Sequence, residues 1–312
     1  MKSSLFLHNV THVDCAVIND KGLPTGLSFV PVFKVTGDIT GDEQVVMDFS
    51  KLKKQLKALI DDKENGYDHK FIVLSQEPAE KPANGEFSLT FPDWSLTCPY
   101  DAVKTVVVTD NTTDGLLAII AKDMANYLSR ATGFEVECYI AEPEFASPNG
   151  LPHLCGETNA IAYSFEYTHG LPKSSSFGCQ NIMHGHAAYL HLGSNRSGRT
   201  EEAQEFVDAS LASLAELIAT YLDEGYFVCK DHVTKHKDGH YTVEYVAERG
   251  HFKLSLPKEY NVVVMENEPT IENIVKHVSE VFKAELKENR VTSLAISEGL
   301  WKGSVETLPY TV

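Results

Sequence analysis

The stretch Cys179-Gln-Asn-Ile-Met-His184-Gly-His186-Ala-Ala-Tyr-Leu-His-Leu192 decides the fold of the region around it. Its second part predicts a β-strand, and residues two apart in a strand point to the same face of the sheet. His184 and His186 therefore present two imidazoles side by side, with no bulk at Gly185 between them. A His-x-His pair alone is usually an ordinary surface feature, so a third ligand is needed before it indicates a metal site.

A third histidine lies just upstream, in Ser164-Phe-Glu-Tyr-Thr-His169. This segment suits a neighbouring antiparallel strand, which would carry His169 to the His184–His186 pair. Three neutral imidazole nitrogens with an open fourth position make a catalytic zinc site. The sequence therefore predicts a Zn²⁺ ion on His169, His184 and His186, used in enzymatic chemistry on a small polar substrate.

Two further features near these histidines carry acid–base chemistry. Cys179 has two open readings: a small buried hydrophobic residue, or a loop thiol whose pKa a nearby cation lowers. Asp231-His232 would supply a carboxylate that fixes the orientation and tautomer of an imidazole. An Asp-His dipeptide alone means little, but this one recurs as Asp68-His69, which gives it weight.

Outward from these motifs, the chain reads as two copies of one plan. Matching segments occur in the same order, and Glu142 and Glu298 follow the last strand of each copy. The expected helices cover 46–60, 116–129, 206–218 and 271–286, and the expected strands include 94–99, 136–140, 252–257 and 293–296. Each copy predicts an antiparallel sheet with two helices on one face, in the α+β class. Two unrelated domains of similar composition are the alternative. We expect domains at 1–148 and 153–312, divided at the Pro- and Gly-rich segment 146–152.

The composition of the 312 residues is typical of a soluble globular protein, with 43% hydrophobic and 23% charged residues. No apolar run approaches the roughly 20 residues that span a bilayer, so no membrane partner is expected. A net charge of −17 argues against a nucleic-acid partner, whose phosphates need a basic surface. Six cysteines without a CxxC pair indicate a reducing compartment, with the cytoplasm as the default.

Five motifs of the second half, taken in order, resemble the 6-pyruvoyl-tetrahydropterin synthase and 6-carboxy-tetrahydropterin synthase family of the tunnelling fold. The resemblance spans nearly the whole chain, once per half. The motifs are Phe165-x-x-x-His169, Cys179 before His184-Gly-His186, Asp231-His232, Pro269-Thr-Ile-Glu-Asn273 and Glu298.

The resemblance implies roles for these residues. The three histidines would hold zinc, and Cys179 with the Asp-His pair would transfer protons. Thr270 would lie near a pterin ring, and Glu298 would anchor its guanidine-like edge through paired hydrogen bonds. The implied substrate is 7,8-dihydroneopterin triphosphate, and zinc would acidify a side-chain hydroxyl and polarise the developing carbonyl. The first expectation is a 6-carboxy product, a precursor of deazaguanines such as queuosine. The alternatives are a 6-pyruvoyl product and a pterin-binding paralogue without catalysis.

The first half departs from the family pattern. Thr25-Gly26-Leu27 replaces the His-Gly-His motif and Ala16 takes the place of the upstream histidine, so no zinc is expected there. Two alternatives follow. Either the first half contributes Asp68-His69 or Glu142 to the zinc site of the second half, or Asp231-His232 and Glu298 serve that site and the first half is a scaffold.

The resemblance also predicts a homo-oligomer, because such sheets close into a barrel only with neighbouring subunits, which removes exposed edges. Two insertions, 76–100 and 235–260, are expected to form hairpins that cover the pocket or alter the assembly. Lys230, Arg249 and Lys302 are the candidate phosphate contacts, and solvated surface is the commoner role for each.

Overall fold

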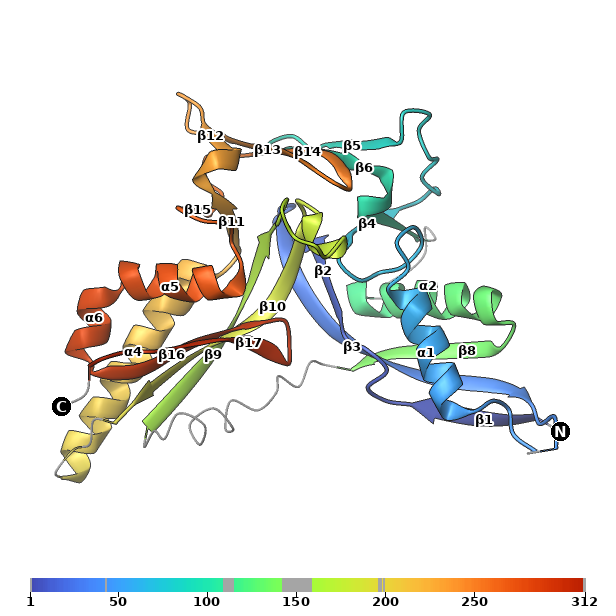
Figure 1. Cartoon of the computed structure of the whole chain (residues 1–312), viewed down its shortest axis with the longest axis horizontal. Coiled ribbons are helices and arrows are strands. Elements are labelled where there is room, and N and C mark those ends of the chain that lie inside the picture. The colour runs from blue at the N-terminus through green and yellow to red at the C-terminus, as the bar shows by residue number, and fades with distance from the viewer. Residues whose placement is uncertain are drawn as a thin grey trace.

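Two long β-hairpins organise the chain, one in each half (Figure 1). The first joins β2 (Val13–Ile18) to β3 (Pro24–Asp38), and the second joins β9 (Asn159–His169) to β10 (His184–Ser194). The computed structural model describes residues 2–42, 44–108, 115–141, 159–195, 198 and 200–310. We refer to residues 2–141 as the first half and to residues 159–310 as the second half.

The first half builds a six-stranded sheet around its hairpin. Its other strands are β1 (Lys2–Leu7), β4 (Phe71–Ser75), β7 (Val103–Val107) and β8 (Glu135–Ala141), and its helices are α1 (Phe49–Ile60) and α2 (Leu116–Thr132). The Asp48 side chain caps α1 by accepting from the Lys51 amide at 2.9 Å. Apolar residues at helical spacing, Leu52, Leu56 and Ile60, then pack into a core with the sheet and α2.

The second half repeats this arrangement with its own core. Its other strands are β11 (Gly225–Cys229), β15 (Val262–Met265), β16 (Val291–Glu298) and β17 (Lys302–Thr307), and its helices are α4 (Glu201–Leu222), α5 (Ile271–Val281) and α6 (Lys283–Glu288). Thr200 caps α4 and Thr270 caps α5 through their side chains. The α+β class and two sheet-and-helix halves are therefore as predicted.

The sheets are antiparallel through their long strands and parallel at one side. β4 runs parallel to β2 and β7, and β11 runs parallel to β9 and β15. The helix after each hairpin carries the chain back along the sheet, so that the next strand starts opposite the carboxyl-terminal part of the first strand and runs in the same direction. The expected sheets lacked this parallel part.

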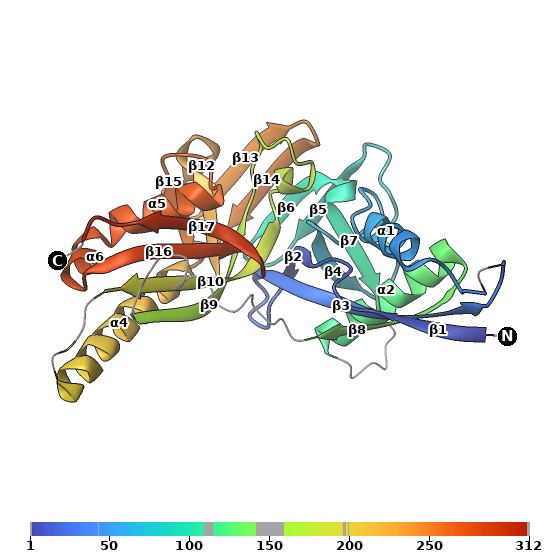
Figure 2. The same ribbon diagram turned by 60° about the horizontal axis from the view of Figure 1, so that its bottom comes forward.

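The two insertions combine into a third sheet that joins the halves. Its order is β12 (Val233–Lys235), β13 (Tyr241–Ala247), β14 (Gly250–Leu256), β6 (Ser95–Pro99) and β5 (Glu86–Thr90). β14 pairs with β6 across the two halves, as Figure 2 shows. A shared apolar core that includes Trp94, Leu96, Phe252 and Leu254 lies beneath it. Each insertion forms a hairpin as expected, and together they connect the halves.

The main hairpins also touch directly, where β3 crosses β10. A Cβ atom on Gly26 would lie 2.6 Å from the His186 amide nitrogen, and one on Gly185 would lie 2.6 Å from the Gly26 Cα. Only glycine allows two backbones to approach so closely. The Ala187 amide donates to Ser28 Oγ at 3.0 Å beside this crossing. First-half side chains are thereby placed against the strand that carries His184 and His186.

The two Asp-His dipeptides occupy different places in their halves. Asp68-His69 precedes β4, whereas Asp231-His232 follows β11, although β4 and β11 are topologically equivalent strands. The reason is loop length: residues 61–70 separate α1 from β4, but only 223–224 separate α4 from β11. The expected correspondence between the two dipeptides is therefore wrong.

Two sequence predictions fall outside the described residues: Glu142 and the segment 146–152. Within the described ranges, no helix has the length and apolar character needed to cross a bilayer.

Candidate metal and acid–base site

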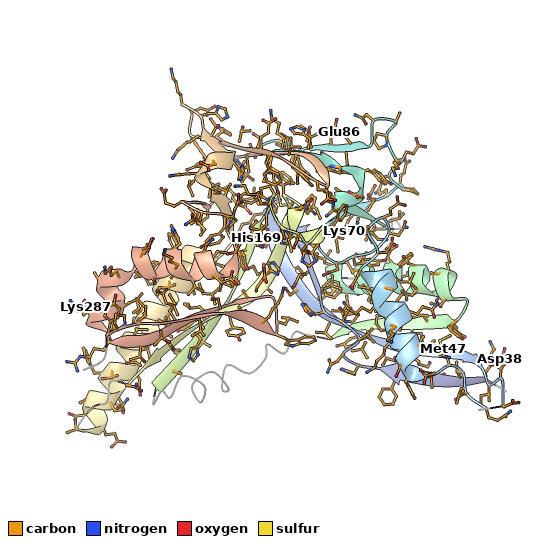
Figure 3. The ribbon with its side chains drawn as sticks, in the orientation of Figure 1. Asp38, Met47, Lys70, Glu86, His169 and Lys287 are labelled. Atoms are coloured by element: carbon orange, nitrogen blue, oxygen red, sulfur yellow. The ribbon has the colours of Figure 1, made fainter. Side chains whose placement is uncertain are left out.

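Three buried imidazoles converge where the two halves meet. His169 ends β9 and pairs in register with His184 at the start of β10, and His186 lies two residues further along the same strand. All three are fully buried. The Nε2 atoms of His169 and His186 lie 3.2 Å apart, and one ligand atom of each histidine lies within 4.8 Å of the others. Figure 3 labels His169 at this position near the crossing of the hairpins.

The outer nitrogen of each ring faces a polar partner. Nδ1 of His169 lies 2.9 Å from the Pro269 carbonyl oxygen, and Nδ1 of His184 lies 2.9 Å from that of Asn181. Because a carbonyl only accepts, these Nδ1 atoms carry the proton and each Nε2 keeps a free lone pair. Nδ1 of His186 lies 3.3 Å from a carboxylate oxygen of Asp14.

These features fit a three-histidine zinc site. His184 Nε2 is buried without a hydrogen-bond partner among the described residues, which is costly unless an ion binds there. Burial, with the neighbouring His186, lowers the pKa of His169 to about 3, so this ring is neutral, as a ligand must be. Burial also lowers the pKa of His184 well below its ordinary value. Outer hydrogen bonds of this kind orient zinc-binding histidines in proteins.

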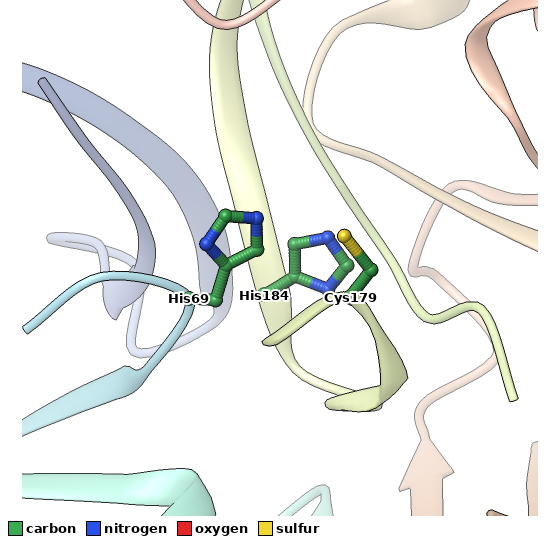
Figure 4. A group of neighbouring side chains, drawn as sticks. All are labelled: His69, Cys179 and His184. Atoms are coloured by element: carbon green, nitrogen blue, oxygen red, sulfur yellow. The ribbon is translucent and has the colours of Figure 1, made fainter. Parts of the chain in front are cut away.

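An acid–base group from the first half lies beside this site. His69 Nδ1 donates to Asp68 Oδ2 at 2.7 Å, and the His69 ring lies next to the Cys179 side chain of the second half. One ligand atom each of His69, Cys179 and His184 lies within 4.8 Å of the others, and Figure 4 shows the three side chains as neighbours.

The charges of His69 and Cys179 support each other. Burial disfavours a charged His69, but Asp68 and Cys179 outweigh it and raise the pKa of His69 well above its ordinary value. Burial likewise raises the pKa of Cys179, but the hydrogen bond and charge of His69 outweigh it and lower that pKa overall. The pair therefore favours a thiolate next to an imidazolium.

The Cys179 loop is held tightly against His69. A Cβ atom on Gly178 would lie 2.8 Å from the Cβ of His69. The Asn181 amide donates to the backbone oxygens of His69 at 3.0 Å and of Ala102 at 2.9 Å. Since the Asn181 carbonyl also accepts from His184, this residue links the loop, the first half and a predicted metal ligand.

Asp14 connects the two parts of the site and was not anticipated from the sequence. Its amide donates to Asp68 at 3.0 Å, and its carbonyl accepts from the His69 amide at 2.6 Å. Its carboxylate accepts from Ser28 Oγ at 2.5 Å and faces His186. Burial raises the pKa of Asp14, but His186 and His12 outweigh it and hold that pKa well below its ordinary value. An acid within the otherwise apolar strand Val13–Ile18 was the available signal.

The structure describes two of the residues expected to bind the substrate, Glu298 and Thr270. Glu298 lies close to the histidine site, and Thr270 is engaged as the cap of a helix. Glu298 ends β16 and pairs with Lys302 at 2.9 Å. Burial raises its pKa, but His186 and Lys302 outweigh burial and lower it. The Thr270 side chain accepts from the Asn273 amide as the cap of α5.

The second Asp-His pair makes different contacts. His232 Nε2 lies 2.9 Å from Glu268 Oε1, and its ring meets Tyr245 edge-on. Asp231 is exposed. The structure thus brings Asp68-His69 to Cys179, and it places Asp231-His232 at a separate group of side chains.

A cavity of about 240 Å³ opens beside His69. Its lining includes Asp68, Phe177, Gly178 and Arg249. Arg249 is paired with Asp101 at 3.2 Å, Lys302 with Glu298, and Lys230 with Glu266. Each candidate phosphate contact therefore already has an acidic partner.

Comparison with known proteins gives matches among solved structures alone. No family model matches the chain, and no curated protein matches it. A 6-pyruvoyl tetrahydropterin synthase from Plasmodium vivax is 16% identical, with a TM-score of 0.30 over 46% of this chain and 92% of that one. The enzyme from Plasmodium falciparum is 14% identical, with a TM-score of 0.34 over 49% and 99%. An uncharacterized protein from Wolinella succinogenes is 16% identical, with a TM-score of 0.32 over 48% and 96%.

Proposed function

We propose that this chain is a zinc-dependent tetrahydropterin synthase of the 6-carboxy type, acting on 7,8-dihydroneopterin triphosphate. Its active site would be composite, with the metal ligands and thiol from the second half and the acid–base pair from the first. The observation that carries this proposal is the contact of Asp68-His69 with Cys179 beside three converging histidines. The pterin substrate is inferred from the order of the sequence motifs, which resembles that of the tetrahydropterin synthase family.

The residues divide the chemistry between them. His169, His184 and His186 would hold the zinc ion, which would supply a Lewis acid for the substrate's hydroxyl and carbonyl oxygens. Cys179, as a thiolate, accepts a proton from the substrate side chain. His69, as an imidazolium oriented by Asp68, donates a proton to the reacting oxygen. Glu298 binds the guanidine-like edge of the pterin as a carboxylate, which its lowered pKa favours.

The assignment extends to the organisation of the chain. The tunnelling-fold domains would cover 1–148, without zinc, and 153–312, with zinc. Val17 pairs with Thr25 as His169 pairs with His184, so Val17, and not the expected Ala16, takes the place of the upstream histidine. Thr25 and Leu27 replace the other two histidines, and none of these three side chains is a usual zinc ligand. A homo-oligomer would pair the outer strands of the two large sheets, at β1, β7 or β8 and at β15 or β17.

The test is incubation of the zinc-loaded protein with 7,8-dihydroneopterin triphosphate and identification of products by mass spectrometry. A 6-carboxy-tetrahydropterin supports the proposal, and a 6-pyruvoyl product moves the chain to the other branch of the family. A Cys179→Ala variant is the matched control, and it should lose turnover while it keeps zinc. No turnover by the wild-type protein with one zinc on the three histidines would contradict the synthase function and leave a binding role.

A further inference from the structure

A separate group of metal-binding side chains lies at the carboxyl ends of β11 and β15. Cys229 ends β11, His232 lies in the short 3-10 helix that follows, and Glu268 comes after β15. Because the two strands are parallel neighbours, with Cys229 opposite Met265, their carboxyl ends bring these residues together. One ligand atom of each lies within 4.8 Å of the others. We propose that Cys229, His232 and Glu268 bind a second zinc ion.

The donor atoms suit zinc. Thiolate sulfur, imidazole nitrogen and carboxylate oxygen are its usual ligands, and bound tetrahedrally they lie roughly 3.3–3.6 Å apart. His232 Nε2 and Glu268 Oε1 are now 2.9 Å apart, so side-chain rotation is enough to admit the ion. The other oxygen of Glu268 is buried without a hydrogen-bond partner among the described residues. A bound cation would satisfy this oxygen.

One neighbouring cation competes with the ion. Lys173 Nζ lies 3.0 Å from Glu268 Oε1, but its side chain is 72% exposed and can turn into solvent. Removal of the Lys173 ammonium should therefore tighten zinc binding at this site. Zinc binding also releases the thiol proton of the buried Cys229 side chain.

The position of the site suggests a structural role. Glu268 precedes Pro269, whose carbonyl oxygen accepts from His169 Nδ1 in the three-histidine site. The side-chain amide of Asn273 donates to the Glu268 carbonyl oxygen at 2.9 Å, and Thr270 caps α5. A zinc ion on Glu268 would fix the peptide segment that orients His169. Zinc binding at this second site does not depend on the pterin reaction.

The test is the zinc content per chain, measured by atomic emission after the full chain is loaded with excess Zn²⁺ and freed of unbound metal. Wild-type protein should hold two zinc ions. Glu268→Gln and His184→Ala should each hold one, because each removes a ligand from a different site. Lys173→Ala should hold two and should resist a chelator at the second site better than wild type does.

Two results would overturn the inference: a wild-type content of one zinc that His184→Ala removes, or two zinc ions retained by Glu268→Gln. If instead the three-histidine site does not bind zinc, His184→Ala would keep the zinc content of the wild-type protein. Cadmium gives a second measurement that does not require counting. In a Cys179→Ser background, thiolate-to-cadmium absorption should persist, and the further change Cys229→Ser should abolish it. Absorption that survives this change contradicts Cys229 as a ligand.

Discussion

At the scale of single residues, we expect substitution of His69 and substitution of His232 to have different effects on kcat. The His69 ring contacts Cys179, whereas His232 contacts Glu268 and Tyr245. A positioned acid or base contributes about 10²–10⁴-fold to a rate, so His69→Ala should lower kcat by that amount. His232→Ala removes no acid or base from this site and affects it only through the proposed second zinc ion, so it should lower kcat by no more than a few-fold. Steady-state kinetics on both variants decides the point, and the reverse pattern would assign the acid–base role to the second half.

The ionisation of Cys179 can be measured without substrate. The pKa of its thiol lies below the ordinary 9.0, because His69 outweighs the opposing effect of burial. In metal-free protein, the alkylation rate against pH should therefore reach half its maximum below pH 9. His69→Ala removes the stabilising partner and should move this midpoint to higher pH. Cys179→Ser gives the background from other cysteines, and an unchanged midpoint in His69→Ala would exclude the ion pair.

Asp14 allows a test of the link between the two halves. Its carboxylate lies 3.3 Å from His186 Nδ1, and both groups are buried. Outer-shell partners of this kind are worth about 10–100-fold in metal affinity, so Asp14→Asn should weaken zinc binding by that factor. Competition with a chelator measures it. Asp231→Asn is the control, since Asp231 is exposed and should not affect the affinity of the histidine site.

At the scale of elements, the crossing of β3 and β10 sets the geometry of the site. An added methyl group at Gly26 meets the backbone of His186 and Tyr167, which cannot move aside independently. Gly26→Ala should therefore cost roughly 1–3 kcal/mol in the free energy of unfolding. Gly115→Ala is the control for an added methyl group that meets no neighbour, because nothing lies within 4 Å of its added Cβ atom, and its own cost is confined to the N-cap of α2. Denaturant unfolding compares them, and equal stability would show that the crossing relaxes freely.

The helices and strands also show which features of the site could be predicted from the sequence and which could not. His169, His184 and His186 were predicted together because the two-residue period of a strand and the register of a hairpin are local properties. The pairing of Cys179 with His69 depends on the packing of β3 on β10 and on the length of the loop 61–70, neither of which local periodicity encodes. The backbone and carboxylate contacts of Asp14 arise from the same long-range packing.

At the scale of the whole molecule, the two halves of one chain provide both parts of the site. The contact of His69 with Cys179 is made within a single chain, and the third sheet joins the halves through β14 and β6. A fused pair of domains thus allows each half to keep a different part of the chemistry. The three histidines that we propose bind zinc are in the second half, and the proposed acid–base pair, Asp68-His69, is in the first.

This arrangement predicts the outcome of mixing two inactive variants. When His69→Ala and His184→Ala are co-expressed, the site within every chain lacks one essential group. Mixed oligomers should then remain inactive, because no chain combines an intact His69 with an intact His184. If active sites formed between neighbouring chains instead, random mixing would restore both groups in about a quarter of those sites. Turnover by co-purified, differently tagged variants measures this fraction, with wild-type protein mixed with His184→Ala as the positive control. Recovery near a quarter would place the active site between chains.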